Sequence, residues 1–137
     1  MNSKLNAVKK NKLSIIIPTL NVGKTLLLTI QSIRKEIKFL TKEIIIVDGG
    51  STDNSKEIAQ KASCKVFDCE RGRGRQLNFG GSQASGEWLL FLHADTSLED
   101  NWEVEVLSFI QNNEKAAFFN YALDDFRQEA RRIVNFR

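Results

Sequence analysis

The chain has 137 residues, 42% of them hydrophobic and 27% charged, and its formal net charge is +3 at pH 7. That length is enough for one domain with a core, and the hydrophobic share excludes a disordered chain. Because the net charge is small and the basic residues are scattered, the composition also argues against a nucleic-acid partner.

The N-terminal residues 1–12 form a polar, lysine-rich extension that lacks the apolar segment of a secretory signal. The longest apolar runs, 44–47 and 88–92, are far shorter than the ~20 residues that cross a bilayer. We therefore expect a cytoplasmic protein, and leave open both peripheral attachment to the inner face of the membrane and homo-oligomerisation. The two cysteines, Cys64 and Cys69, lack C-x-x-C spacing and are expected to be reduced thiols.

Strands and helices alternate along the predicted chain. Short apolar runs predict strands at 13–18, 43–47, 65–68, 88–92 and 116–123. Helical spacing of apolar residues predicts helices at 24–38 and 98–111, and two further predicted helices end near residues 62 and 85. This alternation predicts an α/β fold with a mainly parallel sheet and helices on both faces, in one domain over residues 13–123.

Residues 124–137 carry another apolar stripe at helical spacing, which ends without a stop signal. Such an amphipathic helix needs a surface to pack against. It either completes the core of the domain or begins an acceptor-binding part beyond residue 137, and we favour the second interpretation.

Polar residues follow three of the predicted strands. Ligands of open parallel sheets bind outside the carboxyl ends of strands, near the point where strand order reverses. If the first strand lies between the second and the fourth, the three groups meet in one crevice. Each group also has a structural explanation, in which the second only closes a turn and the first only begins a helix. The residues are Thr19 and Asn21 after the first strand, Asp48 and Gly49 after the second, and His93 and Asp95 after the fourth.

Asp95 ends a predicted buried strand, where a carboxylate can hold a divalent cation that bridges the two phosphates of a nucleoside diphosphate. Mg²⁺ prefers oxygen ligands, whereas Mn²⁺ also tolerates an imidazole. His93 is therefore a second candidate ligand, although a lone histidine beside an apolar strand is more often structural. Asp95 is the better candidate of the two.

Arg71, Arg73 and Arg75 alternate with two glycines just before a predicted helix. Glycine lets the backbone approach a ligand closely, and the guanidinium group suits bidentate contacts with phosphate. The helix N-terminus that follows would add a preference for anions. A solvated surface loop is the alternative interpretation of the same residues.

Three segments in this order resemble the N-terminal signatures of family 2 glycosyltransferases: 14–21 (SIIIPTLN), 45–53 (IIVDGGSTD) and 86–95 (GEWLLFLHAD). Segment 71–78 (RGRGRQLN), together with HADT at 93–96, more narrowly resembles the subgroup called rSAM/selenodomain-associated transferase 2. The resemblance implies a GT-A, Rossmann-like fold with strand order 3-2-1-4. It also implies a UDP- or GDP-linked sugar as donor, Mn²⁺ or Mg²⁺ as cofactor, an unknown acceptor, and transfer with inversion.

For individual residues, the resemblance implies that the segment from Pro18 to Asn21 and Asp48 face the base and ribose of the donor. It also implies that Asp95 takes the place of the second aspartate in the family's Asp-x-Asp metal motif. His93 departs from that motif, in which most members carry aspartate, but agrees with the subgroup. The predicted donor-binding residues are Pro18, Thr19, Asn21, Asp48, Gly49, Arg71, Arg73, Arg75, Asn78, His93 and Asp95.

An inverting transferase needs a general base that deprotonates the acceptor hydroxyl. The family carries this base well beyond the metal motif, and Asp124 and Asp125 do not resemble the base motif. We therefore expect the base to be absent. A non-catalytic half-domain that only binds the donor is thus the alternative function.

A P-loop nucleotide hydrolase is a more distant alternative. Gly23-Lys24-Thr25 ends like a phosphate-binding P-loop, but Pro18 occupies the position of the first glycine of that motif. A dinucleotide-dependent oxidoreductase is weaker still, because no G-x-G-x-x-G follows the first predicted strand.

Overall fold

Strands and helices alternate through the computed structural model, which describes residues 12–35 and 40–112. The chain divides into two compact units, Met1–Leu98 and Glu99–Arg137, and the sheet belongs to the first unit. In chain order the elements are β1 (Lys12–Thr19), α2 (Leu26–Arg34), β2 (Thr41–Asp48), α3 (Ser55–Lys61), β3 (Lys65–Asp68), α4 (Arg73–Gln83), β4 (Trp88–Phe91) and α5 (Trp102–Gln111).

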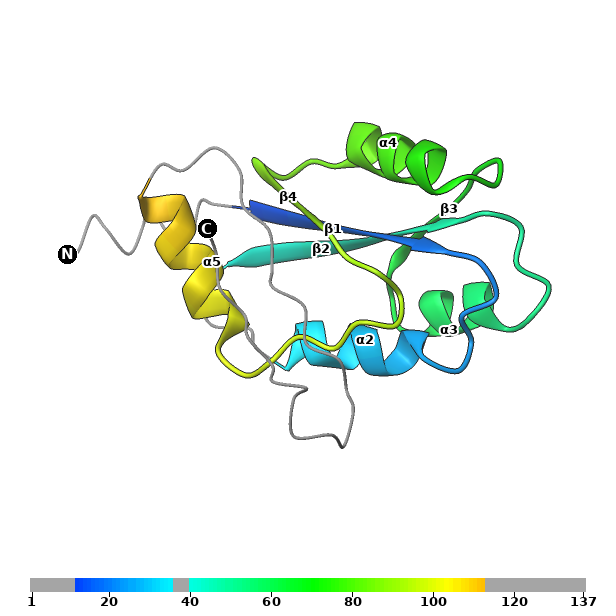
Figure 1. Ribbon diagram of the computed structural model, residues 1–137, viewed down its shortest axis with the longest axis horizontal. Helices are drawn as coiled ribbons and strands as arrows, with labels where there is room; N and C mark the ends of the chain where they lie inside the picture. Colours follow the sequence, from blue (N-terminus) through cyan, green and yellow to red (C-terminus); the bar gives the residue numbers. More distant parts are fainter. Residues whose placement is uncertain (1–11, 36–39, 113–137) are drawn as a thin grey trace, which may run out of the picture. The chain divides into compact units, whose positions relative to one another are not determined.

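The four strands are parallel and lie in the order β3-β2-β1-β4, which confirms the predicted order. β1 and β2 are paired along their whole length, with Thr19 opposite Asp48 at the carboxyl end. Their isoleucines, 15–17 and 44–46, are at most 6% exposed, as expected for strands covered on both faces. α4 covers one face of the sheet, and α2 and α3 cover the other (Figure 1).

α4 approaches the sheet closely at Gly80. A Cβ atom at this position would lie 2.9 Å from Cγ2 of Val47 and would also collide with Ile16, so only glycine fits. Leu77 and Phe79 of the same helix pack on the buried cluster that contains Ile16 and Val47. The close approach sets the distance between α4 and the two central strands.

Pro18 lies in β1 at the point where pairing with β4 stops. The ladder between β1 and β4 ends with Ile16 opposite Phe91, followed by a hydrogen bond of 3.0 Å from the N–H of Leu92 to Ile16 O. Because alternate residues of a strand direct their N–H groups to the same side, the N–H that Pro18 lacks would have faced β4. Proline thus ends this ladder where the strand order reverses, which is where open α/β sheets bind ligands.

Two helices begin later than predicted because the backbone turns first. α2 begins at Leu26 rather than 24, since the N–H groups of Thr25 and Leu26 both donate to Val22 O in a turn. α5 begins at Trp102 rather than 98, because Asn101 before it has a left-handed backbone with φ of 68°.

The helix that follows the basic segment begins earlier than predicted. α4 begins at Arg73, inside the stretch predicted to precede the helix. The predicted strand 116–123, the predicted helix in 124–137 and the pair Asp124 and Asp125 lie outside the described residues. None of the described helices is long and apolar enough to cross a membrane.

Candidate functional site

The loops that follow β1 and β2 are joined to each other through Asn21. Its Oδ1 accepts hydrogen bonds from the N–H groups of Thr52 and Asp53, at 2.8 and 3.2 Å. Its own N–H donates to Oγ of Ser51 at 2.8 Å. These bonds fit its left-handed backbone (φ 51°), which asparagine tolerates better than most residues. Asn21 therefore does not begin a helix, since the N-cap of α2 is Thr25.

Two further backbone bonds extend this contact between the loops. The N–H of Val22 donates to Oγ of Ser55, and the N–H of Gly23 donates to Oδ2 of Asp53, both at 2.9 Å. Hydrogen bonds from the Ser55 hydroxyl and from the Gly23 N–H lower the pKa of Asp53, so this carboxylate is ionised at neutral pH. The two loops thus form one hydrogen-bonded unit.

Asp48, the last residue of β2, is fully buried, and its carboxylate accepts four hydrogen bonds. Oδ1 accepts from the hydroxyls of Thr19 (2.8 Å) and Ser51 (2.6 Å). Oδ2 accepts from the N–H groups of Gly50 (3.1 Å) and Ser51 (2.8 Å). A carboxylate offers about four lone-pair sites, so these donors saturate it. The contact of Asp48 with the base and ribose stays a prediction, while in the structure its side chain shapes the loop.

The protonation state of Asp48 follows from these contacts. Burial raises the pKa of this carboxyl, but the hydrogen bonds from Ser51, Thr19 and Gly50 outweigh burial, and the pKa lies below its ordinary value. Asp48 is therefore a buried anion at neutral pH.

Gln76 of α4 joins the carboxyl ends of β1 and β2. Its Nε2 donates to Thr19 O at 3.0 Å and to Val47 O at 2.9 Å, and its Oε1 accepts from the N–H of Gly72 at 3.2 Å. The residue is only 4% exposed. A Cβ atom at Gly49 would lie 2.9 Å from Oε1 of Gln76, so this glycine leaves room for the glutamine side chain.

The arginines of segment 71–75 lie at the N-terminus of α4. Gly72 is the N-cap residue, and Gln76 ties its N–H to the carboxyl edge of the sheet. Arg75 pairs with Glu70 at 2.8 Å, and both side chains are exposed. Arg71 and Arg73 are also exposed, and neither has an ion-pair partner within residues 12–35 and 40–112. Two free guanidinium groups and a helix N-terminus, which favours anions, thus lie beside this edge.

His93 and Asp95 are exposed on the loop that follows β4, and Ala94 between them is buried. Ala94 O accepts hydrogen bonds from the hydroxyls of Thr25 (3.0 Å) and Thr29 (2.8 Å). α2 therefore anchors the middle of this loop, while the two candidate metal ligands on either side remain accessible.

The ligand chemistry of this loop suits a cation that binds together with a diphosphate. No group of three or more His, Cys, Asp or Glu side chains in the described part of the chain could hold a metal ion by itself. Mg²⁺ is usually bound by only one or two carboxylates, with substrate phosphates and waters as the other ligands. One accessible carboxylate, Asp95, with the imidazole of His93 two residues away, fits that pattern.

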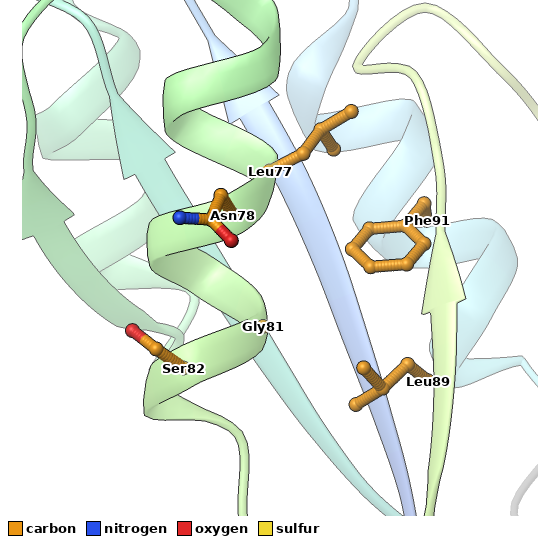
Figure 2. A pocket seen from close by; sticks show the side chains of 6 residues that line it. All are labelled: Leu77, Asn78, Gly81, Ser82, Leu89 and Phe91. Carbon is orange, nitrogen blue, oxygen red and sulfur yellow. The ribbon is translucent and has the colours of Figure 1, made fainter.

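An open groove of about 420 Å³ lies between α4 and β4 (Figure 2). Leu77 of α4 and Leu89 and Phe91 of β4 face one another across it. Asn78 also lines this groove, and none of the other predicted donor-binding residues does. Its contact with the donor stays a prediction.

Three loops bring most of the other predicted residues to one edge of the sheet. The loop after β1 is the centre, since Asn21 bonds to the loop after β2 and Thr25 bonds to the loop after β4. Gln76, Thr25 and Thr29 are supporting residues that were not predicted from the sequence. Their spacing could have indicated them, because residues four apart lie on the same side of a helix. Gln76 lies four residues before Gly80, and Thr25 lies four residues before Thr29.

Comparisons with known proteins agree with this arrangement. The model of Glycosyl transferase family 2 matches residues 14–133. The PGL/p-HBAD biosynthesis glycosyltransferase of Mycobacterium bovis is 39% identical over an alignment of 111 residues, which covers 74% of this chain and 42% of that protein. The chain thus spans between about a quarter and two fifths of the length of the curated relatives it matches.

Two solved structures share the fold. S. aureus TarS 1–349 in complex with UDP-GlcNAc is 30% identical, with a TM-score of 0.67 over 74% of this chain and 31% of that chain. The glucosyl-3-phosphoglycerate synthase of Mycobacterium tuberculosis, in complex with Mn²⁺, UDP and glucosyl-3-phosphoglycerate, has a TM-score of 0.66 over 79% of this chain and 43% of that chain. At 24% identity, this second likeness shows the fold alone. Sheet order, signatures and family match agree: the chain belongs to glycosyl transferase family 2 and has the GT-A fold.

Proposed function

We propose that the protein binds a UDP-linked sugar at the carboxyl edge of the sheet and transfers the sugar, with inversion, to an acceptor. The observation that carries this proposal is the convergence of three bonded loops at that edge, with Asp95 accessible on one of them. Family membership supports the reaction. We propose UDP instead of GDP as the nucleotide because TarS, at 30% identity, was solved with UDP-GlcNAc.

Each part of the site has a distinct chemical task in this proposal. Arg71 and Arg73 and the N-terminus of α4 bind the diphosphate. Asp95, with His93 as the weaker ligand, would hold Mn²⁺ or Mg²⁺, which when bound would supply Lewis-acid stabilisation of negative charge on the diphosphate. Asn21 and Asp48 fix the shape of the loops that receive the nucleoside.

Calorimetric titration with UDP tests donor binding. We expect binding that Mn²⁺ strengthens, weaker binding of GDP, and no competition by ATP. Asp95→Asn should remove most of the strengthening by Mn²⁺ without changing the melting temperature, because Asp95 is exposed and removing its charge leaves no buried group unpaired. Binding of ATP as tight as that of UDP, or UDP binding that ignores Mn²⁺ in the wild type, would contradict the proposal.

Transfer is measured separately from binding. Nuclear magnetic resonance of the product's anomeric proton distinguishes inversion from retention. Donor binding without transfer to any of a panel of acceptors would favour the second candidate, a domain that holds a nucleotide sugar without using it. The share of the relatives' length that this chain spans makes that comparison necessary.

A further inference from the structure

Three hydroxyl groups form a stripe along α2, and all three bond to the loop after β4. Thr25 is the N-cap residue of the helix, and Thr29 and Ser32 follow at four and seven residues, which places them on one side of the helix. The loop that they contact, residues 92–98, carries both candidate metal ligands and runs along α2 (Figure 1). We call these three residues the hydroxyl stripe.

The first two hydroxyls share one acceptor, Ala94 O. Their hydroxyls lie 3.0 and 2.8 Å from it, whereas the alternative acceptors in the preceding turn, Val22 O for Thr25 and Thr25 O for Thr29, are both at 3.4 Å. A hydroxyl has a single proton, so each donates to the nearer oxygen, and a carbonyl oxygen has two lone pairs to receive both. Ala94 O is thus saturated by the stripe.

The third hydroxyl fixes the far end of the same loop. Oγ of Ser32 accepts a hydrogen bond from the N–H of Leu98 at 3.1 Å and donates to Thr29 O at 2.7 Å. Hydrogen bonds to α2 therefore hold the loop on both sides of Asp95. At its start the loop is held by the bond from Leu92 N–H to Ile16 O of β1.

The orientation of Thr25 distinguishes this contact from ordinary helix capping. Threonine at an N-cap normally accepts a hydrogen bond from an N–H of the first turn. Thr25 makes no such bond and directs its hydroxyl to Ala94 O instead. The helix forgoes the stabilisation of a cap at this position, and the loop gains a second anchor.

We propose that Thr25 and Thr29 are positioning residues that set the place of Asp95, an inference that rests on the proposed function of Asp95 as a metal ligand. The physical link is the peptide plane. Ala94 C=O and the N and Cα atoms of Asp95 belong to one planar unit, so fixing the oxygen fixes the plane from which the carboxylate extends. A ligand held in this way loses less freedom when it binds a cation.

Hydrogen exchange of the free protein tests the mechanical half of the inference without metal or nucleotide. The variant Thr25→Val/Thr29→Val keeps the side-chain shape and removes both donors, which leaves Ala94 O buried and unpaired. We expect faster exchange at residues 93–98, with exchange of the β1 and β2 amides unchanged. Thr25→Ser/Thr29→Ser, which retains both hydroxyls, should exchange like the wild type.

Calorimetry with UDP tests the functional half. For the double valine variant, we expect the increase in UDP affinity that Mn²⁺ causes to be about tenfold smaller than in the wild type. This factor is on the scale of the two lost hydrogen bonds. The UDP affinity measured in EDTA should stay within a factor of two of the wild type. The serine variant should recover most of the gain. A residue that only stabilised the fold would lower the affinity equally with and without Mn²⁺.

The outcomes separate the two proposals. A wild type whose UDP affinity does not respond to Mn²⁺ overturns the proposed metal site and this inference with it. A wild type that responds, beside a double valine variant with a fast-exchanging loop and an undiminished response to Mn²⁺, overturns this inference alone. Should the double variant unfold, Thr29→Val alone is expected to lose about threefold of the gain, and an unchanged gain there overturns the inference equally.

Discussion

β2 carries a buried carboxylate near each end, Glu43 at its start and Asp48 at its finish, 7% and 0% exposed. The pKa of both lies below its ordinary value. Their partners differ in charge. Glu43 accepts from Lys65 Nζ at 2.6 Å and has Lys12 Nζ at 3.6 Å, whereas in the described part of the chain Asp48 accepts only from hydroxyl and N–H groups.

Glu43 joins the starts of the strands into one network. Its Oε1 accepts from the Ser14 hydroxyl of β1 at 2.6 Å and from the N–H of Ser85, before β4, at 2.7 Å. Burial raises its pKa, but the bonds from Lys65, Ser14 and Ser85 outweigh burial. This end of the sheet is a closed, charge-compensated structure, and none of the predicted donor-binding residues lies in it.

The difference between the two ends has a functional reading. At the amino end the negative charge is cancelled by lysines, so it only holds the strands together. At the carboxyl end the carboxylate of Asp48 is stabilised by hydroxyl and N–H groups instead of a direct ion pair, so the shape of the loops there depends on these hydrogen bonds.

Removing each charge in turn should produce the largest effects. Glu43→Gln and Asp48→Asn are both expected to lower the free energy of unfolding by about 2–3 kcal/mol, because each leaves buried partners poorly satisfied. Only Asp48→Asn should also weaken UDP binding, by more than about tenfold, because its NH₂ group opposes the N–H groups of the loop. Urea unfolding and calorimetry measure the two effects, and equal loss of UDP affinity in both variants would erase the comparison.

The contact between Gly49 and Gln76 should give the next largest effect. Gly49→Ala forces the glutamine aside and is expected to cost about 1–3 kcal/mol, and Gln76→Ala should cost a similar amount by removing the buried hydrogen bonds to Thr19 O and Val47 O. In the double variant the clash disappears, so the total should fall short of the sum by about 1 kcal/mol. Gly74→Ala, where a Cβ meets nothing within 4 Å, is the matched control. Strict additivity in urea unfolding would show that the two residues do not interact.

Acid should weaken both ends, but from different starting points. A depressed carboxyl pKa contributes stability above the ordinary value and loses it as pH falls toward the folded value. The contribution of Glu43 should therefore decline as pH falls below 4.5, and that of Asp48 below 3.8. In urea unfolding midpoints measured against pH, the fall that begins below pH 4.5 should be smaller in Glu43→Gln than in the wild type. A wild-type decline that Glu43→Gln leaves unaltered would show that Glu43 is not its source.

The smallest effects should come from the arginines. Arg71→Ala and Arg73→Ala are expected to lower UDP affinity several-fold, and the loss should shrink as salt rises, because exposed charges are screened. Arg75→Ala should change UDP affinity less, since its guanidinium is paired with Glu70, and should leave stability unaltered within error because that pair is exposed. If all three variants behaved alike in titrations at two salt concentrations, the pairing of Arg75 would have no functional meaning.

The sequence was informative where one residue type decides the structure locally. The isoleucine runs of β1 and β2 predicted buried parallel strands, and the polar residues that follow them predicted the edge where the three loops meet. The functions of Asn21 and Asp48 as links between loops could not be predicted, because their partners depend on which loops meet. Gln76 escaped for a similar reason, since its bonds to two strands exist only because α4 lies so near the sheet.

Because α4 lies so close to the sheet at Gly80, a substitution there is expected to tilt the whole helix. Between Gly80, where the helix touches the sheet, and Arg73, at its first turn, the axis rises about 10 Å. Any side chain at position 80 would push α4 away from the sheet, since Val47 and Ile16 leave no room for a Cβ atom. A small tilt of α4 at position 80 would displace the arginines at its N-terminus by a larger distance. An apolar substitution at position 80 is therefore expected to change the affinity of the proposed diphosphate site, although it lies far from that site.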